Sequence, residues 1–495
     1  MVQSSARGVL GDAAPFDART IPAYGGDHAR VYAHIQAHQA EHVAELQRWL
    51  RQPSISAQNA GVHEMAELLR DDLLALGFRE AELVPTDGHP GVFGFYDAGA
   101  PRTLLVYMMY DVQPVEPADW RSPPFAAELV EHERGRVLMG RGAVNQKGPE
   151  RAFLNAVASI IAVEGRLPVN LFVAAEGEEE LGSPHYPQVV APYAERLRTA
   201  LGTFFPFPSQ NPLGEATLPL GVKGISYWEL EARGHAAGGP TQAEIHGSFK
   251  AIVDSPVWRL VQALATLTSA DGNTITVPGY ADAVRPPNDE ERSLLRGMLA
   301  SWDEETIKRV IGVERWVDGI SGEEALVRYL CTPTLNIDGI WAGYTGEGTK
   351  TILPHLATAK VDSRLVPNQQ PEEALRLVRE HLDRNGFSDI AIRELSGYPP
   401  AQSSVTSSLV QAAIGVYTKY GRTPLVQPRL AGSAPYYVFT GTLGLPTVMG
   451  GLGHGSGAHA PNEYLVIDPQ PGSTIAGLAE MEMAYADLLY ALAAA

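Results

Sequence analysis

Two short and mainly apolar segments that lead into acidic residues constrain the fold of this chain most. Residues 103–110 read TLLVYMMY and lead directly into Asp111, and residues 167–174 read LPVNLFVA and lead into AEGEEE. Runs of this length are typical of strands buried on both faces. Helical periodicity in residues 28–51, 65–76 and 151–163 separates them, which predicts an α/β fold with a mainly parallel central sheet.

Acidic residues follow both predicted strands. In a parallel sheet the functional site lies at the carboxyl ends of the strands. Asp111 ends one strand, and Glu179 and Glu180 follow the other within AAEGEEELGS. The sequence therefore predicts a site that contains these three carboxylates.

The middle of the chain has a different pattern. Residues 221–234, GVKGISYWELEARG, alternate as a strand does, and segments of strand and helix follow in a compact α+β order. Three helices and two strands are expected there, at residues 255–267, 288–301, 372–385, 334–340 and 357–365. Residues 407–420, 445–449 and 473–494 then predict a helix, a core strand and a closing helix.

Composition excludes several classes of function. The net charge of −19 disfavours nucleic acid and anionic membrane as partners, because both would be repelled. No segment is apolar for long enough to span a membrane, and the first residues lack a secretion signal, so we expect a cytoplasmic protein. The single cysteine, Cys331, lies in the apolar, β-prone run ALVRYLCTPTLNI, which predicts a buried and inert thiol.

Four motifs appear in a fixed order: YDVQP at residues 110–114, GRGAVNQKG at 140–148, EGEEELGS at 176–183 and HAPNEY at 459–464. They resemble the M20 family of metallopeptidases and amidohydrolases, most closely its carnosinase-like dipeptidase branch. That branch has G-H-Y-D-V-Q-P, G-R-G-x-x-D-x-K-G, E-G-x-E-E-x-G-S and H-x-P-N-E-Y. The resemblance covers roughly residues 28–495.

The resemblance implies a three-layer α/β/α catalytic domain with an inserted α+β lid that carries the dimer contact. The expected division is a loose N-terminal arm at residues 1–26, a discontinuous catalytic domain at 27–222 and 397–495, and a lid at 223–396. The resemblance also implies two zinc ions with five protein ligands, and a glutamate that acts as the general base. Two such cations activate a shared water and polarise the amide carbonyl.

The metal ligands implied by the resemblance are only partly present. Met109 stands in the position of a zinc-binding His, and a neutral thioether is a weak ligand for zinc. Asn145 stands where an Asp bridges both ions, and an amide carries no charge to hold them together. No Asp occurs in residues 201–227, where another ligand is expected near Phe207. Glu180 and His459 remain, with Asn145 as a weak third donor.

We therefore predict no metal at full occupancy, with one zinc ion as the alternative. His454 could replace a lost ligand, but a His in a glycine-rich loop is more often a substrate contact or merely exposed. By resemblance, Glu179 is the general base, and carboxylates beside it should raise its pKa. Asp111 has lost the His that it would orient. Either it accepts a substrate ammonium or acts as a base, or it serves the structure alone.

The substrate-binding residues implied by the resemblance are retained. Arg364 in DSRLVP matches a residue that grips a substrate carboxylate, a role suited to a guanidinium. Asn336, the segment 343–354, and Gly432 with Ser433 also match, and Asn145 is placed among the substrate contacts. His246 matches a residue that reaches across the dimer, but the chain reads H-G-S where the family has H-S-G.

Three functions fit these residues. The first is a repurposed M20-like enzyme that acts on a small amino-acid-derived amide or dipeptide-like substrate by acid–base chemistry of its carboxylates. Hydrolysis, amide formation and elimination are all compatible with it. The second is a dipeptidase or amidohydrolase with a single zinc ion. The third is a non-catalytic dimer that binds a ligand or a partner protein. The first is preferred, because a binding protein has no evident need for all these motifs together.

Overall fold

The computed structural model describes residues 8–494, with only the backbone of residue 237, and divides the chain into two compact units. The large unit comprises Ala14–Gly221, Gln402–Pro428 and Val438–Ala495. The small unit comprises Met1–Ala13, Val222–Ala401 and Arg429–Tyr437. Each unit is therefore built from segments that are far apart in the sequence.

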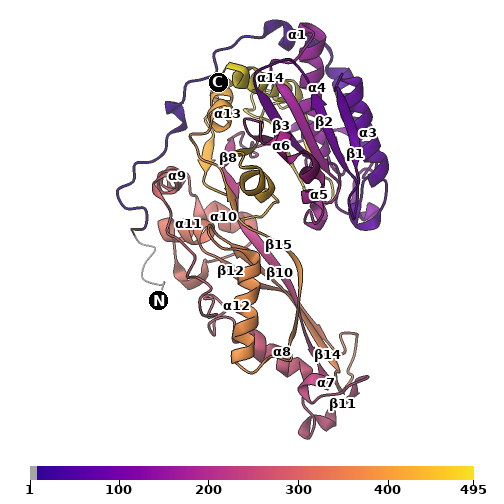
Figure 1. Ribbon diagram of the computed structural model, residues 1–495, viewed down its shortest axis with the longest axis vertical. Helices are drawn as coiled ribbons and strands as arrows, with labels where there is room; N and C mark the ends of the chain where they lie inside the picture. Colours follow the sequence, from indigo (N-terminus) through magenta and orange to yellow (C-terminus); the bar gives the residue numbers. More distant parts are fainter. Residues whose placement is uncertain (1–7, 495) are drawn as a thin grey trace. The chain divides into compact units, whose positions relative to one another are not determined.

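The large unit is built on a six-stranded sheet with the order β1-β2-β6-β3-β7-β18. Strands β6, β3, β7 and β18 run parallel, whereas β1 and β2 are antiparallel to their neighbours. The predicted α/β fold with a mainly parallel central sheet is thus confirmed (Figure 1). The strands are β1 (Glu80–Val84), β2 (Gly91–Tyr96), β3 (Thr103–Met109), β6 (Asn170–Glu176), β7 (Thr203–Pro206) and β18 (Thr447–Gly450).

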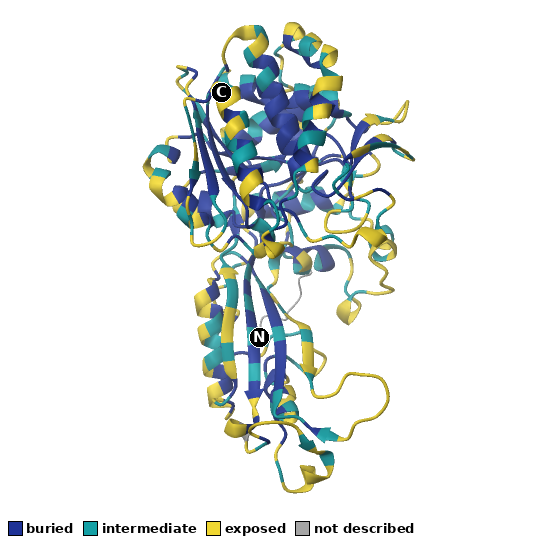
Figure 2. Cartoon of the chain, turned by 90° about the vertical axis from the view of Figure 1, so that its right-hand side faces the viewer, coloured by how far each residue is buried: buried dark blue, intermediate teal, exposed yellow. Residues whose placement is uncertain are grey.

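Helices complete this unit. Helix α4 (Lys147–Glu164) is buried along most of its length, and α1, α2 and α14 pack against it. Figure 2 shows the buried residues gathered in the central strands and inner helices. The other helices are α1 (Ala29–Ala37), α2 (Gln39–Arg51), α3 (Val62–Ala75), α5 (Tyr186–Val190), α6 (Ala194–Leu197), α13 (Ser408–Lys419) and α14 (Leu478–Ala494).

A second sheet in the large unit has the order β19-β20-β5-β4. Its strands are β4 (Glu128–His132), β5 (Gly135–Met139), β19 (Gly455–Ser456) and β20 (Tyr464–Pro469). Strands β5 and β20 pair antiparallel, with Tyr464 opposite Met139. Short β8 (Thr217–Pro219) and β17 (Leu425–Gln427) form a parallel pair. The second sheet brings the loop after Met139 next to the loop before Tyr464.

The small unit is α+β, as predicted. Its antiparallel sheet has the order β12-β14-β10-β15, and α8 and α12 pack on it around buried Trp228 and Val361. Asn288 caps α9 in a capping box with Glu291, which confirms the predicted N-cap. The strands are β10 (Gly224–Arg233), β12 (Thr334–Ala342), β14 (Leu356–Leu365) and β15 (Ala391–Tyr398), with short β11 (Ile245–His246) and β13 (Ile352–Leu353). The helices are α7 (Gly234–Ala237), α8 (Pro256–Leu264), α9 (Asp289–Leu299), α10 (Glu304–Ile311), α11 (Gly322–Cys331) and α12 (Pro371–Arg384).

Three expectations about local structure were wrong. The helix expected over residues 28–51 is two helices that meet at His38. Cys331 ends helix α11, so the run predicted as β-prone is helical up to that residue, and the thiol is only partly buried. The arm is not loose where it is described, because Leu10, Ala18 and Ile21 are buried. The predicted arm residues 1–7 lie outside the described residues.

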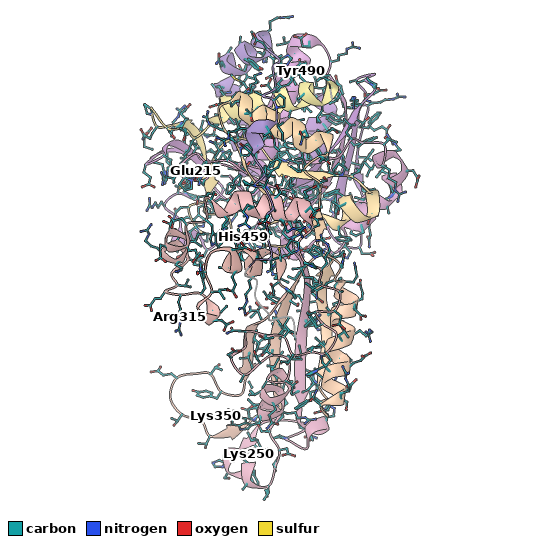
Figure 3. All side chains as sticks on the ribbon, turned by 90° about the vertical axis from the view of Figure 1, so that its left-hand side faces the viewer. Glu215, Lys250, Arg315, Lys350, His459 and Tyr490 are labelled. Carbon is teal, nitrogen blue, oxygen red and sulfur yellow. The ribbon has the colours of Figure 1, made fainter. Side chains whose placement is uncertain are left out.

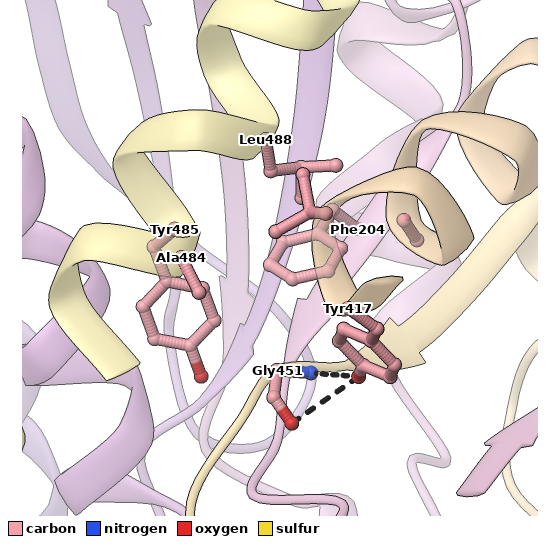
Figure 4. Close-up of a pocket in the computed structure, with 8 residues that line it drawn as sticks. Phe204, Tyr417, Gly451, Ala484, Tyr485 and Leu488 are labelled. Atoms are coloured by element: carbon pink, nitrogen blue, oxygen red, sulfur yellow. Dashed lines mark hydrogen bonds between the residues drawn. The ribbon is translucent and has the colours of Figure 1, made fainter. Parts of the chain in front are cut away.

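A small apolar pocket in the large unit lies between α13, α14 and the end of β7 (Figure 4). Phe204, Tyr485 and Leu488 line it, and the Tyr417 hydroxyl accepts a hydrogen bond from the Gly451 amide at 2.6 Å. The buried Tyr485 hydroxyl has no hydrogen-bond partner among the described residues. No helix within residues 8–494 is both long and apolar enough to cross a membrane.

Candidate functional site

Asp111 organises the site at the carboxyl ends of β3 and β6. It has no exposed surface, and its carboxylate accepts hydrogen bonds from the Ser56 hydroxyl at 2.7 Å and from the amides of Glu179 and Glu180 at 3.1 Å each. Burial raises the pKa of Asp111 to about 7. These contacts suit a residue that fixes the Glu179–Glu180 turn. A catalytic role for Asp111 stays a prediction.

Glu179 begins a short 3-10 helix (Glu179–Leu181) directly after the loop that follows β6. Burial raises its pKa well above the ordinary value, and the nearby carboxylates of Glu180, Asp111 and Glu176 raise it further. A carboxyl with a raised pKa binds a proton more readily and can exchange it with a substrate. This environment is the one that a general acid or base requires.

Glu180, Asn145 and His459 are in direct contact. The Asn145 side-chain Nδ2 donates to Glu180 Oε1 at 2.7 Å, and the Gln113 amide donates to Glu180 Oε2 at 2.8 Å. His459 Nε2 lies 3.1 Å from Glu180 Oε2 and 3.2 Å from Asn145 Nδ2. The hydrogen bond to Glu180 raises the pKa of His459. Both oxygens of the almost fully buried Glu180 thus already have donors.

The His459 ring is reachable from solvent, although its partner is not. Its side chain is 58% exposed, whereas that of Glu180 is 4% exposed. Figure 3 labels His459 among the side chains of the molecule. The site therefore presents an imidazole at its surface and keeps its carboxylates beneath.

The residues in the lost ligand positions do not fit a pair of zinc ions. Met109 is buried, and its backbone amide donates to Glu150 Oε1 at 2.7 Å. Phe207 follows β7 in the position of an expected acid. No three His, Cys, Asp or Glu side chains within residues 8–494 are arranged to hold a metal together. The Asn145 side-chain amide donates a hydrogen bond to Glu180. In the resembling family, an anionic residue at this position bridges two cations.

His454 is engaged elsewhere. Its Nδ1 lies 2.8 Å from the Gln210 carbonyl oxygen, and its Nε2 lies 3.3 Å from the Tyr464 hydroxyl. The ring is buried, and burial lowers its pKa. With both nitrogens in contact with protein groups, the ring is held within the large unit by contacts that do not include Glu180.

In the small unit, Arg364 and Ser433 are brought together. Arg364 Nη1 donates to Ser433 Oγ at 2.9 Å, and Ser433 Oγ donates to the Gly224 carbonyl at 3.0 Å. Arg364 Nε also donates to Asp362 Oδ1 at 3.0 Å. Gly432 accepts a hydrogen bond from the Lys223 amide through its carbonyl oxygen. Part of the Arg364 guanidinium is therefore already neutralised by Asp362.

Asn336 continues this polar network. Its Nδ2 donates to Asp338 Oδ1 at 2.9 Å and to Asp362 Oδ2 at 3.3 Å. Burial, and the nearby carboxylate of Asp362, raise the pKa of Asp338. Arg364, Asp362, Asn336 and Asp338 thus form one chain of polar side chains on β12 and β14.

His246, on short β11, keeps a defined orientation despite the exchanged motif. Its Nδ1 accepts from the Ser248 amide at 3.2 Å and lies 2.8 Å from the Ser248 hydroxyl. Its Nε2 lies 3.3 Å from the Thr351 hydroxyl. The serine that changed place in H-G-S is therefore what fixes the ring. Whether the ring meets a substrate stays a prediction.

Comparison of the sequence with protein-family models identifies the family of this protein. The model described as Peptidase family M20/M25/M40 matches residues 105–474. The chain belongs to the M20 peptidase family. The resemblance read from the four motifs is confirmed, and so is the α/β fold with an additional α+β domain.

Relatives of this M20 protein include dipeptidases. A Beta-Ala-His dipeptidase of Rattus norvegicus is 28% identical over 81% of this chain and 84% of its own length. A Cys-Gly metallodipeptidase of Schizosaccharomyces pombe is 29% identical over 89% of this chain and 94% of its own length. The crystal structure of an M20 family metallo-carboxypeptidase from Sulfolobus solfataricus has a TM-score of 0.82 and 33% identity, covering 92% of this chain and all of that one.

Sequence reasoning missed several residues of this M20 site. Ser56 donates to Asp111 from a segment more than fifty residues away, and nothing in its neighbourhood marks it. Gln113 contacts Glu180, and Glu463 holds the backbone of the loop that carries Asn145. Gln113 lies in the motif YDVQP and Glu463 in the motif HAPNEY. These two motifs were therefore a signal from which both residues could have been identified.

Proposed function

We propose that this M20 protein acts on the amide bond of a small dipeptide-like or amino-acid-derived substrate. We further propose that it does so without the pair of zinc ions that the resembling family uses. The dipeptidase activities of its relatives support the substrate class. Acid–base chemistry at the buried carboxylates would replace the metal-activated water.

One contact carries the second part of the proposal: the hydrogen bond from Asn145 Nδ2 to Glu180 Oε1, at 2.7 Å. An Asp at this position would repel Glu180 unless cations lay between them. An amide instead donates to Glu180 directly and needs no cation. Two carboxylates at these positions would need a metal ion between them, whereas the Asn145–Glu180 pair is stable without one.

Glu179 is the proposed proton carrier. Its pKa is raised by burial and by neighbouring acids, which makes the ionised carboxylate a stronger base. It would take a proton from the attacking water as the C–O bond forms, and would then give that proton to the leaving nitrogen as the C–N bond breaks. Asp111 holds the Glu179 backbone in place through its 3.1 Å hydrogen bond, and Arg364 is the proposed grip for a substrate carboxylate.

The proposal is tested by measuring metal content and activity on one preparation. Zinc is determined by elemental analysis after dialysis, and hydrolysis is assayed on a dipeptide panel that includes β-Ala-His and Cys-Gly, with and without a chelator. We expect well under two zinc ions per chain and hydrolysis that survives the chelator. Two tightly held ions, or activity abolished by chelation and restored by zinc, would refute the metal-free proposal.

The remaining alternatives appear as separate outcomes of that experiment. One ion per chain with zinc-dependent activity would identify a single-zinc dipeptidase, held by Glu180 and His459. Binding of dipeptides without turnover, unchanged in E179Q, would identify a non-catalytic binding protein. E179Q is the informative variant because it removes the proton of Glu179 and preserves its shape.

We also propose a homodimer formed through the small unit. Among the described residues, strand β12 has a neighbouring strand on one side only, and its Ile337, Ile340 and Trp341 are 46%, 49% and 45% exposed. Trp258 of α8 is 61% exposed. An apolar edge strand that is left open is a site for strand pairing. I340K should yield monomers in size-exclusion chromatography with light scattering. V310K is the matched control, because Val310 of α10 is also exposed.

A further inference from the structure

Glu463 is a buried carboxylate that the proposed chemistry does not use. It has no exposed surface, and it accepts four hydrogen bonds. Arg141 Nη1 and the Gly142 amide donate to its Oε2 at 2.7 and 3.1 Å, and the amides of Val144 and Asn145 donate to its Oε1 at 2.9 and 2.8 Å. Three of the four donors are backbone amides of one loop.

These contacts join the two loops that supply the site. Residues 140–145 follow β5 and carry Asn145, and residues 457–463 precede β20 and carry His459. The Gly140 amide also donates to the Glu463 carbonyl at 2.9 Å. Because β5 and β20 pair antiparallel, the loop after β5 and the loop before β20 lie at the same end of the two strands. Glu463 is the side chain that fixes one loop on the other.

We propose that Glu463 is a positioning residue for the site. By holding the backbone of Asn145 from the loop of His459, it sets the side chains of both residues against Glu180. A carboxylate is required because its two oxygens provide acceptor sites for all four donors, whereas a glutamine has one acceptor oxygen and would turn an amide group toward N–H donors. Loop amides that converge on an anion form a backbone nest.

The test uses E463Q with two readouts, one of which does not need a substrate. The reaction of His459 with diethyl pyrocarbonate, followed by peptide mass spectrometry, reports whether its Nε2 is still held at Glu180. We expect the reaction to be about tenfold faster in E463Q, and faster also in N145A. E463D, which keeps the charge, should recover part of the wild-type rate. A wild-type rate in E463Q would overturn the proposal.

E482Q is the matched control. Glu482 is equally buried in the large unit and accepts from His42, Gln39 and Asn155 at 2.7–2.9 Å, away from the site. Its loss should lower stability without changing the reactivity of His459. If E482Q accelerates the reaction as much as E463Q does, general loosening is the cause and the proposal is wrong.

The second readout is kcat on the dipeptide that the protein turns over, and this part rests on the proposed function. E463Q should lower kcat by about tenfold to 100-fold with little change in KM, since small misplacements of a site are costly. In the N145A background, E463Q should cost less than it does in the wild type, because part of its effect is exerted through Asn145 and the rest through His459. Additive losses would overturn the proposal. If the wild-type protein has no activity, the proposed function fails, and the reactivity of His459 alone decides on Glu463.

Discussion

Replacing Asn145 by aspartate (N145D) reverses the contact on which the metal-free proposal depends. The amide now donates to Glu180 Oε1 at 2.7 Å. In the variant, two carboxylates would face each other at about 3 Å, where two unit charges repel by about 5 kcal/mol at an effective dielectric of about 20. The alternative is to protonate one of them, which at pH 7 costs about 4 kcal/mol for an aspartate of ordinary pKa.

The cheaper alternative sets the expected loss of stability. Because Asn145 is only partly buried, solvent screening reduces the cost, and we expect about 2–4 kcal/mol at pH 7. The proximity of Glu180 raises the folded-state pKa of the new carboxyl above its unfolded value. The destabilisation should therefore grow as pH rises and should fall to about 1 kcal/mol near pH 5.

Urea unfolding of metal-stripped protein at pH 5 and pH 7, with and without added zinc, measures these effects. Zinc should restore N145D at pH 7, because Glu180 and His459 flank the new carboxylate. N155D is the matched control: the Asn155 amide also donates to a buried glutamate, Glu482, at 2.9 Å, but not beside the site. It should be destabilised and should gain nothing from zinc. Metal-free N145D as stable as wild type at pH 7 would refute the reasoning.

Three further expectations concern single side chains. E179Q should lower kcat on a dipeptide by about 100-fold or more without lowering the urea midpoint, which separates proton transfer from folding. R364A should raise KM by about tenfold to 100-fold for substrates with a free carboxylate and leave their amides unaffected, as steady-state kinetics would show. Burial raises the pKa of Glu176 to about 8, so its contribution to stability is full below its unfolded pKa and lost as pH rises through about 8. E176Q should therefore unfold at higher urea than wild type at pH 9 and show little gain at pH 5; the opposite order would contradict the assignment.

The sequence predicted those parts of the fold that local patterns determine. Strand β3 was found because its apolar run has no other stable environment than a buried sheet. The break at His38 was missed, because the helical periodicity continues through it while the chain turns to pack α1 and α2 separately on α4. The Leu10 amide donates to Glu323, more than three hundred residues away, so no local pattern could show that this part of the arm is held in place.

The sequence predicted which residues belong to the candidate site better than it predicted how their side chains contact each other. The motifs placed Glu179, Glu180 and His459 in a common site, and Glu180 and His459 do meet, at 3.1 Å. That the Asn145 amide satisfies Glu180 could not be read from the letters, because an amide can donate or accept and its direction depends on three-dimensional neighbours. The contacts of His454 with Gln210 and Tyr464 are likewise set by tertiary structure.

The arm has a consequence for biosynthesis. Residues 8–13 belong to the small unit, where the Leu10 amide donates to Glu323 Oε1 at 3.0 Å and Arg296 donates to the Gly11 carbonyl at 2.6 Å. Leu10 and Glu323 are 313 residues apart, so the ribosome needs roughly 15–60 s to produce the partner after the arm emerges. During that interval the apolar Leu10 lacks its native surroundings and is accessible to chaperones.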